Sequence, residues 1–321
     1  MYERIVVPLD GSAFSEGAIA YAALIAARSG ATIELVHVHV PEPEDDALYS
    51  FTAYRYTGVV QWYRQVDRAA MRREVEAYRA RAADLASETG LPVIARVVSG
   101  HIDRGIEEEA ETFHADLIVM GTHARTGFAR VRFGSVAETV VRMSTVPVLL
   151  VRPDAETSAS LSPPDISRVL VALDGSAFSE QVLPPAARLA AVFDAALGVV
   201  HVETGLREAP SSFDELSAAD ARVGEQYLHG HVAKSEHLPD GARLLLVGSP
   251  HPADAIMDAA SRLGSDLIAM ATHGRGGLSR LIMGSTANEV MRRTRLPVLL
   301  HRPDARVVRA TVAAHTERIH A

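Results

Sequence analysis

The sequence contains no cysteine, and only one of its 32 basic residues is a lysine. The absence of cysteine excludes disulfide scaffolds, thiolate zinc sites, iron–sulfur clusters and cysteine nucleophiles. Lys234 is therefore the single candidate for mechanisms that need a Walker-type lysine, a Schiff-base lysine or a Ser–Lys pair, and no such motif surrounds it.

Excess positive charge and long apolar runs are also missing. The formal net charge is -8 and the pI about 6.0, which argues against a basic nucleic-acid-binding surface. No stretch approaches 18 uninterrupted apolar residues, the longest candidate being residues 17–27. The first residues, MYERIVVP, lack the charged-then-apolar pattern of a signal peptide. We therefore expect a cytoplasmic protein without nucleic-acid or membrane partners.

The chain is long enough for two domains, and it repeats itself. Its 321 residues exceed the roughly 100–200 residues of one domain. The heptapeptide DGSAFSE at 10–16 recurs unchanged at 174–180, and PVLL at 147–150 recurs at 297–300. These collinear matches predict two copies of one domain. The expected boundaries are domains at 1–153 and 168–303, a Ser/Pro-rich linker at 154–167 and an unassigned tail at 304–321.

Both copies alternate short apolar runs with amphipathic or Ala-rich segments. The runs predict strands at 5–9, 33–40, 93–98, 116–120 and 146–151, and at 169–173, 196–202, 243–247, 266–270 and 296–301. Helices are expected at 13–28, 62–89, 102–114 and from 135, and at 177–193, 217–234, 253–263 and from 285. The pattern predicts an α/β, Rossmann-like architecture with two tandem open parallel five-stranded sheets and helices on both faces. Right-handed crossovers place the ends of strands 1 and 4 at the edge where ligands of such folds bind.

A glycine-bearing loop follows the fourth strand in each copy and leads into a helix. The first copy reads GTHA, nine residues, then Gly134-Ser135; the second reads ATHG, nine residues, then Gly284-Ser285. Free N–H groups and the positive end of a helix dipole form an anion site there. We expect the two serines to cap their helices and donate to phosphate, with loop arginines supplying charge. The alternative is that glycine and serine only turn the chain and cap the helix.

These motifs resemble the universal stress protein family in its tandem form. The family motif is Gly, two residues, Gly, nine residues, then Gly-Ser or Gly-Thr, and the resemblance covers about residues 2–153 and 167–303. Ala124 replaces the second glycine of the first copy, and Ala271 replaces the first glycine of the second. If either position requires positive φ, the alanine costs on the order of 1–2 kcal/mol and weakens its site.

The resemblance implies the family fold and, as in one branch of the family, bound ATP, which we expect together with Mg²⁺. In that branch the strand-2 valine backbone holds adenine, the strand-1 aspartate lies near the ribose, and the loop and Gly-Ser hold the phosphates. No catalytic residue and no protein-built metal site are expected. The implied cofactor-binding residues are Asp10, Val38, Gly121, Thr122, His123, Arg125, Gly127, Gly134, Ser135, Val136, Asp174, Val202, Thr272, His273, Gly274, Arg275, Gly277, Gly284, Ser285 and Thr286.

The functional prediction is an ATP-binding, nucleotide-dependent regulator of stress response or dormancy. A slow ATPase or phosphotransferase is one alternative, although the missing Walker lysine argues against fast turnover. A nucleotide-free dimerising module is the other, and the two alanines favour it. The fifth strands are expected to pair within one chain, and we also expect a homodimer and a protein partner that the sequence does not identify.

Three further features carry weaker hypotheses. His37 and His39 lie on one side of the second strand, at a spacing suited to metal ligands, but without a matching carboxylate pattern. The acidic run 107–111 is interpreted as a solvated helix face. The aromatic-rich segment 49–63 has no counterpart in the second copy, so it is either local packing or a lid or partner surface.

Overall fold

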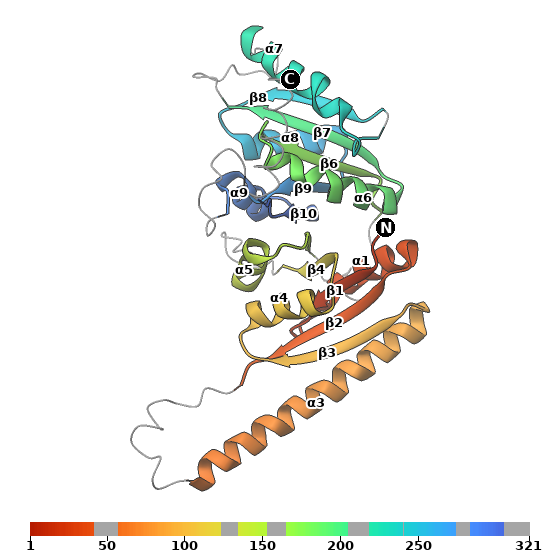
Figure 1. Cartoon of the computed structure of the whole chain (residues 1–321), viewed down its shortest axis with the longest axis vertical. Coiled ribbons are helices and arrows are strands. Elements are labelled where there is room, and N and C mark those ends of the chain that lie inside the picture. The colour runs from red at the N-terminus through yellow and green to blue at the C-terminus, as the bar shows by residue number, and fades with distance from the viewer. Residues whose placement is uncertain are drawn as a thin grey trace, which may run out of the picture.

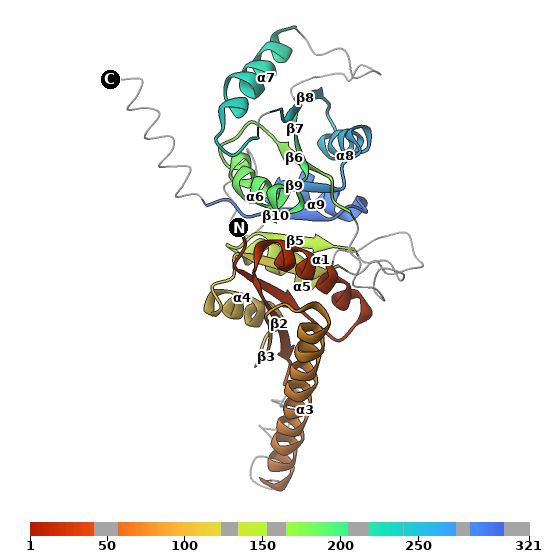
Figure 2. The ribbon, with the colours of Figure 1, turned by 90° about the vertical axis from the view of Figure 1, so that its right-hand side faces the viewer.

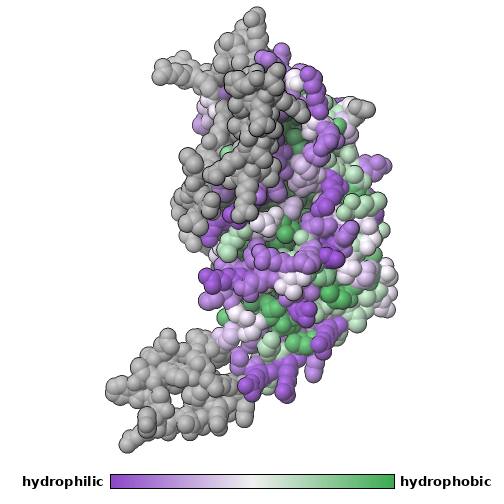
Figure 3. Space-filling view, viewed as in Figure 1, coloured by the Kyte–Doolittle hydropathy of each residue, from purple (hydrophilic) through white to green (hydrophobic). Residues whose placement is uncertain are grey.

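The computed structural model describes residues 1–41, 57–122, 134–152, 165–204, 218–239, 241–273 and 283–304, without the side chains of 57–66 and 218–223. The molecule is elongated, and its two halves lie one after the other along the long axis (Figures 1 and 2). Helix α3 (Thr57–Thr89) extends from the first half away from the second. Hydrophilic side chains dominate the described face seen in Figure 3, with apolar ones in small groups between them.

Each half contributes five strands and a set of helices. The first half contains β1 (Arg4–Pro8), α1 (Ala13–Ser29), β2 (Thr32–His39), α3, β3 (Val93–Ser99), α4 (Ile102–Thr112), β4 (Leu117–Gly121), α5 (Ser135–Met143) and β5 (Val148–Val151). The second contains β6 (Arg168–Leu173), η2 (Ser179–Val182), α6 (Leu183–Phe193), β7 (Ala196–Glu203), α7 (Ala218–Gly230), η3 (Val232–Lys234), β8 (Arg243–Gly248), α8 (Pro252–Leu263), β9 (Leu267–Ala271), α9 (Ser285–Arg293) and β10 (Val298–His301).

The ten strands form one continuous sheet in the order β3-β2-β1-β4-β5-β10-β9-β6-β7-β8. Every neighbouring pair is parallel except β5 and β10, which are antiparallel with Val298 opposite Leu150. The predicted α/β class with parallel five-stranded units is therefore confirmed. The predicted pairing of the fifth strands within one chain is also confirmed, and it joins the two units edge to edge.

Helices cover both faces of the sheet, so each face has its own apolar core. One core contains Val7, Ile19 and Leu85, and continues into α6 of the second half. The other contains Val6 and Ile106, and continues into α8 and α9. Alternate residues of β1 enter opposite cores because successive side chains of a strand point to opposite faces. Burial on both faces explains why the strands are apolar throughout.

Two sequence expectations about helices are wrong. The helix expected over 177–193 is interrupted: a 3₁₀ turn, η2, precedes α6, whose first turn contains Pro184 and Pro185. The acidic run on α4 is not a fully solvated face either, because Glu109 is only 7% exposed. Its carboxylate lies near that of Glu34, which is 1% exposed. Arg96 Nε lies 3.4 Å from the Glu109 carboxylate and 4.0 Å from that of Glu34.

Several predicted segments lie outside the described residues. These are 154–164 of the linker, 305–321 of the tail and 49–56 of the aromatic-rich segment. Residues 57–63 of that segment form the first part of α3, which therefore begins before the expected residue 62. Among the described helices, none is both long and apolar enough to cross a membrane.

Candidate functional site

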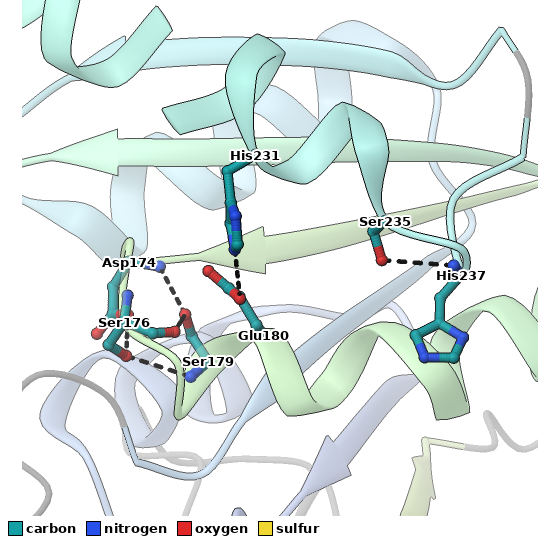
Figure 4. A network of polar contacts seen from close by, with 7 residues as sticks. All are labelled: Asp174, Ser176, Ser179, Glu180, His231, Ser235 and His237. Atoms are coloured by element: carbon teal, nitrogen blue, oxygen red, sulfur yellow. Dashed lines mark hydrogen bonds and ion pairs between the residues drawn. The ribbon is translucent and has the colours of Figure 1, made fainter. Parts of the chain in front are cut away.

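The first strand of each half ends in a turn that fixes an aspartate. In the second half, Asp174 Oδ1 accepts hydrogen bonds from the backbone N–H of Ser176 at 3.0 Å and from its hydroxyl at 2.6 Å (Figure 4). Asp174 N–H in turn donates to Ser179 Oγ at 3.3 Å. Asp10 makes the same bonds with Ser12 and Ser15. Both aspartates are thus held rigidly at the carboxyl ends of β1 and β6.

The second strand ends beside this turn and is tied to it by a histidine. His37 Nδ1 lies 2.9 Å from the carbonyl oxygen of Leu9, the residue before Asp10. His201 Nδ1 lies 3.2 Å from the equivalent carbonyl of Leu173. Each contact aligns the ends of the first two strands, so that the following valine, Val38 or Val202, lies next to the aspartate turn.

The fourth strand and the following helix complete the edge. Thr122 N–H donates to the carbonyl of Val151, and Thr272 N–H to that of His301, both at 2.9 Å. Gly284 N–H donates to the Thr272 carbonyl at 2.8 Å, which brings the start of α9 against the end of β9.

The N-cap residues of α5 and α9 are Gly134 and Gly284, and neither helix has a side-chain cap hydrogen bond. The prediction that Ser135 and Ser285 cap these helices is therefore wrong, since each serine is the first helical residue. Glycine caps leave the first amide groups without a side-chain acceptor from the cap. Such amides, at the positive end of a helix dipole, are suited to an anion.

In the second half these elements surround a cavity of about 480 Å³. Its size lies within the range of small-molecule sites. Ala172, Ile256 and Met270 give it apolar walls. The predicted residues that line it are Asp174, Val202, Thr272, His273, Gly284, Ser285 and Thr286.

His273 is one of the residues that line this cavity. His273 Nδ1 lies 2.9 Å from the Thr272 hydroxyl, but Nε2 is buried without a hydrogen-bond partner among the described residues. A buried polar atom without a partner is costly.

The first half places its predicted residues at equivalent positions. Asp10, Val38, Gly121 and Thr122 lie at or just after the ends of β1, β2 and β4. Gly134, Ser135 and Val136 begin α5, and the latter two line a cleft of about 300 Å³ together with Val40 and Ile102. The remaining predicted residues lie outside the described residues: His123, Arg125, Gly127, Gly274, Arg275 and Gly277.

The alanine at position 271 carries no backbone penalty. Ala271 ends β9 and is not among the described residues with positive φ. Its counterpart Gly121 is constrained by space instead, because a Cβ there would lie 2.3 Å from the carbonyl oxygen of Phe14. The substitution therefore reflects different packing beside β4 and β9.

Sequence reasoning missed two polar residues that line the cavity. Ser179 belongs to the repeated heptapeptide, and its hydroxyl accepts from Asp174 N–H. The exact repetition of that heptapeptide was a usable signal. Thr204 follows β7 where the first half has Val40, and no pattern in the sequence marks it.

A second polar cluster lies behind the first-half site. The imidazole of His39 contacts Glu74 Oε2 through Nδ1 at 2.7 Å and Asp67 Oδ1 through Nε2 at 2.8 Å. The sequence has no carboxylate pattern that matches the histidine pair, and it is the fold that brings these two α3 carboxylates to His39. Burial lowers the pKa of His39, but the hydrogen bonds that its ring N–H groups donate to Asp67 and Glu74, together with the charge of these carboxylates, outweigh burial, so the pKa is raised. Within the described ranges, no group of three or more histidine and acidic side chains is arranged to hold a metal ion.

The fold and this edge define an α/β protein with a candidate ligand site at the carboxyl ends of parallel strands. The universal stress protein family profile matches residues 1–152 and 166–302, so the chain belongs to the universal stress protein family.

Similar proteins cover the whole chain or one half of it. Universal stress protein Rv2005c of Mycobacterium tuberculosis is 28% identical over 303 residues, covering 93% of this chain and 96% of its own length. Universal stress protein MJ0531 of Methanocaldococcus jannaschii is 32% identical over 152 residues, covering 47% of this chain and 83% of its own length. The crystal structure of a universal stress protein from Archaeoglobus fulgidus has a TM-score of 0.65 at 22% identity, covering 93% and 98% of the two chains. The last shows a shared fold.

Proposed function

We propose that the chain binds ATP together with Mg²⁺ at the carboxyl edge of each half. The observation that carries this proposal is the second-half cavity, where an apolar pocket, a fixed aspartate and a glycine-capped helix start lie together. These three features match the parts of a nucleotide: a flat apolar base, a sugar with hydroxyls and an anionic phosphate chain.

Each part of the site has a distinct task. The backbone at Val202 holds the adenine edge, with Ile256 and Met270 against its faces. The Asp174 carboxylate lies where ribose hydroxyls need an acceptor. The amides at Gly284 and Ser285, with the hydroxyl of Thr286, receive the phosphates. Mg²⁺ bound with the nucleotide would offset charge between the phosphate oxygens.

The proposed role is regulation by occupancy. Asp174 Oδ1 already accepts two hydrogen bonds from Ser176, so the proposed task of this carboxylate is to position the ribose and not to act as a base. The single lysine of the chain, Lys234, lies on η3 and does not line the cavity. Nucleotide binding would instead change the surface presented to a protein partner. The proposal includes a cytoplasmic location, because ATP is an intracellular ligand. It also includes the association of two chains and the domain boundaries expected from the repeat.

The test is isothermal titration of nucleotide-stripped protein with Mg-ATP. We expect two unequal sites per chain, because the halves differ around Gly121 and Ala271. Gly284→Val should remove one site, since a Cβ there already lies 3.1 Å from the Thr272 carbonyl oxygen. Gly134→Val should remove the other.

The matched control is Ser261→Ala on the exposed side of α8, which should leave both sites intact. Phosphate release followed in parallel separates binding from turnover. No heat with the wild-type protein would contradict the proposal and favour a nucleotide-free module. Steady phosphate release that Gly284→Val and Gly134→Val together abolish would instead favour a slow ATPase.

A further inference from the structure

Two arginines cross between the halves of the molecule. Arg152 directly follows β5, and its Nη1 donates to the carbonyl of Thr294 at 2.6 Å while its Nη2 donates to that of Met291. Arg302 directly follows β10, and its Nη1 donates to the carbonyl of Met143 at 2.6 Å. Each arginine therefore lies at the carboxyl end of a helix that belongs to the other half.

The two helices held in this way are α9 and α5, whose amino ends form the candidate phosphate sites. The last carbonyls of a helix have no intrahelical partner, and a cation placed on them is favoured by the helix dipole. Arg152 meets this need at Met291 and at the C-cap residue Thr294 of α9. Arg302 meets it at Met143, the last residue of α5.

Each arginine is also one peptide away from the site of its own half. The carbonyl of Val151 accepts from Thr122 N–H, and Arg152 is the next residue. The carbonyl of His301 accepts from Thr272 N–H, and Arg302 is the next residue. A short covalent and hydrogen-bonded path thus leads from each site, through an arginine, to the helix that forms the other site.

The helices are short enough to act as rigid links. α9 has nine residues, or about 13 Å at 1.5 Å per residue. Val290 and Met291 are buried in the core, and Gly284 is bonded to the end of β9. A shift at the carboxyl end of α9 therefore moves the amides at its amino end relative to the cavity.

We propose that Arg152 is a positioning residue for the second-half site and Arg302 for the first-half site, so that the two sites are coupled crosswise. This inference rests on the proposed nucleotide function. By linkage, ATP bound in one half changes the ATP affinity of the other half, and the effect is reciprocal.

The crossed arrangement gives a sharp experiment. Gly134→Val leaves only the second-half site and Gly284→Val leaves only the first, so each background reports one Mg-ATP affinity by titration. In the Gly134→Val background, Arg152→Gln should weaken binding about threefold to tenfold, while Arg302→Gln changes it by less than about twofold. In the Gly284→Val background, Arg302→Gln should weaken binding about threefold to tenfold, and Arg152→Gln should change it by less than about twofold.

A general loosening between the halves would not produce this exchange. Equal losses at both sites, or no loss at either, would overturn the coupling while leaving the nucleotide function intact. Arg152→Lys, which keeps the charge, should recover part of the affinity. Thermal unfolding verifies that each variant is folded.

Failure of the nucleotide function is seen separately, as an absence of heat in the wild-type protein, and it would overturn the coupling as well.

Hydrogen exchange on nucleotide-free protein gives a second readout. Arg152→Gln should speed exchange in the last turn of α9 and not in α5, and Arg302→Gln should do the reverse. Exchange that rises in both helices with either variant contradicts the proposal.

Discussion

The identical heptapeptides at 10–16 and 174–180 adopt the same turn but different helices. Gly11 and Gly175 have φ values of +78° and +83°, and in both copies the first serine bonds to the aspartate. In the first half Ser12 then caps α1, which continues without a break to Ser29. In the second half the chain passes through the 3₁₀ turn η2 before α6 begins at Leu183.

The difference comes from residues outside the heptapeptide. Pro184 and Pro185 have no N–H to donate to the carbonyls of Glu180 and Gln181, so an α-helix cannot run through them from position 177. On the neighbouring strand, Gly121 allows the close approach of Phe14, whereas Ala271 carries a methyl group at the same place. Local sequence thus sets the turn, and packing partners set the helix that follows.

The largest expected effect comes from exchanging these strand residues. Gly121→Ala places a Cβ 2.3 Å from the Phe14 carbonyl oxygen, where only backbone movement can relieve the clash. We expect the free energy of unfolding to fall by about 3 kcal/mol, measured by urea denaturation. The matched change Ala271→Gly should cost about 1 kcal/mol. Equal effects at the two positions would show that α1 does not pack more closely than η2.

The next prediction concerns the buried acid pair, which only the first half has. Glu34 and Glu109 correspond to Gly198 and Ala259 in the second half. Burial, reinforced by the nearby Glu109 carboxylate and opposed by Arg96, raises the pKa of Glu34 to about 7. A raised acid pKa means that the folded state binds the proton more tightly, so stability falls as the pH rises from about 4.5 to about 7.

Between pH 5 and pH 8 the free energy of unfolding of the wild-type protein should fall by on the order of 2 kcal/mol more than that of the Glu34→Gln variant. Urea denaturation across that range measures it. Glu108→Gln on the exposed side of α4 is the control and should leave the pH dependence unchanged. A Glu34→Gln protein with the wild-type pH profile would contradict the assignment.

Much of this fold follows from the sequence because its signals are local. Apolar runs define the strands, and the repeated Gly-Ser marks the starts of α5 and α9. The burial of Glu109 was also accessible, since its spacing from Ile106 and Ala110 puts it beside them on the inner stripe of α4. The cap assignment failed because glycine and serine are both accepted N-caps, and spacing alone does not separate them.

Other features depend on residues far apart in the chain. Arg152 meets α9 across 139 residues, and nothing local marks that contact. To predict the interruption of the second-half helix, the effect of Pro184 and Pro185 had to be judged stronger than the signal from the heptapeptide that the two halves share. The assignment of the site residues to a bound nucleotide stays a prediction until the titrations are made.

The third prediction compares how α3 and α7 are held on the sheet. His39 binds Asp67 and Glu74 of α3, whereas the equivalent residue of β7 is Glu203. Because the folded pKa of His39 is raised, the stabilisation is complete below its ordinary value of 6.5 and is lost as the pH rises through the folded value.

Hydrogen exchange in residues 67–78 of α3, corrected for intrinsic rates, should therefore be faster at pH 8.5 than at pH 6. His39→Gln should remove this difference. The described part of α7 serves as the internal control. A pH difference that persists in the variant would assign the effect to other groups.

The smallest expected effect concerns the first helical turn of each half. Glu16 pairs with Arg81 at 2.9 Å, and Glu180 pairs with His231 at 3.0 Å. Arg81→Ala should lower the free energy of unfolding by about 0.5 kcal/mol, because the pair is partly screened by solvent. The His231 side chain is 67% exposed, so His231→Ala should change it less. Urea denaturation at pH 7 compares the two, and a larger effect at His231 would reverse their ranking.

Because β5 and β10 belong to one chain, the two surfaces that meet at the interface between the halves do not have to be identical. Two identical subunits around a twofold axis must present the same patch to each other. Here Arg188 stacks 4.1 Å over Tyr2 and bonds to the Asp116 carbonyl on one side, while Leu24 and Ile166 occupy the mirrored positions. The covalent link also fixes a one-to-one pairing at any dilution. Each copy can therefore acquire substitutions that a homodimer would have to accept twice.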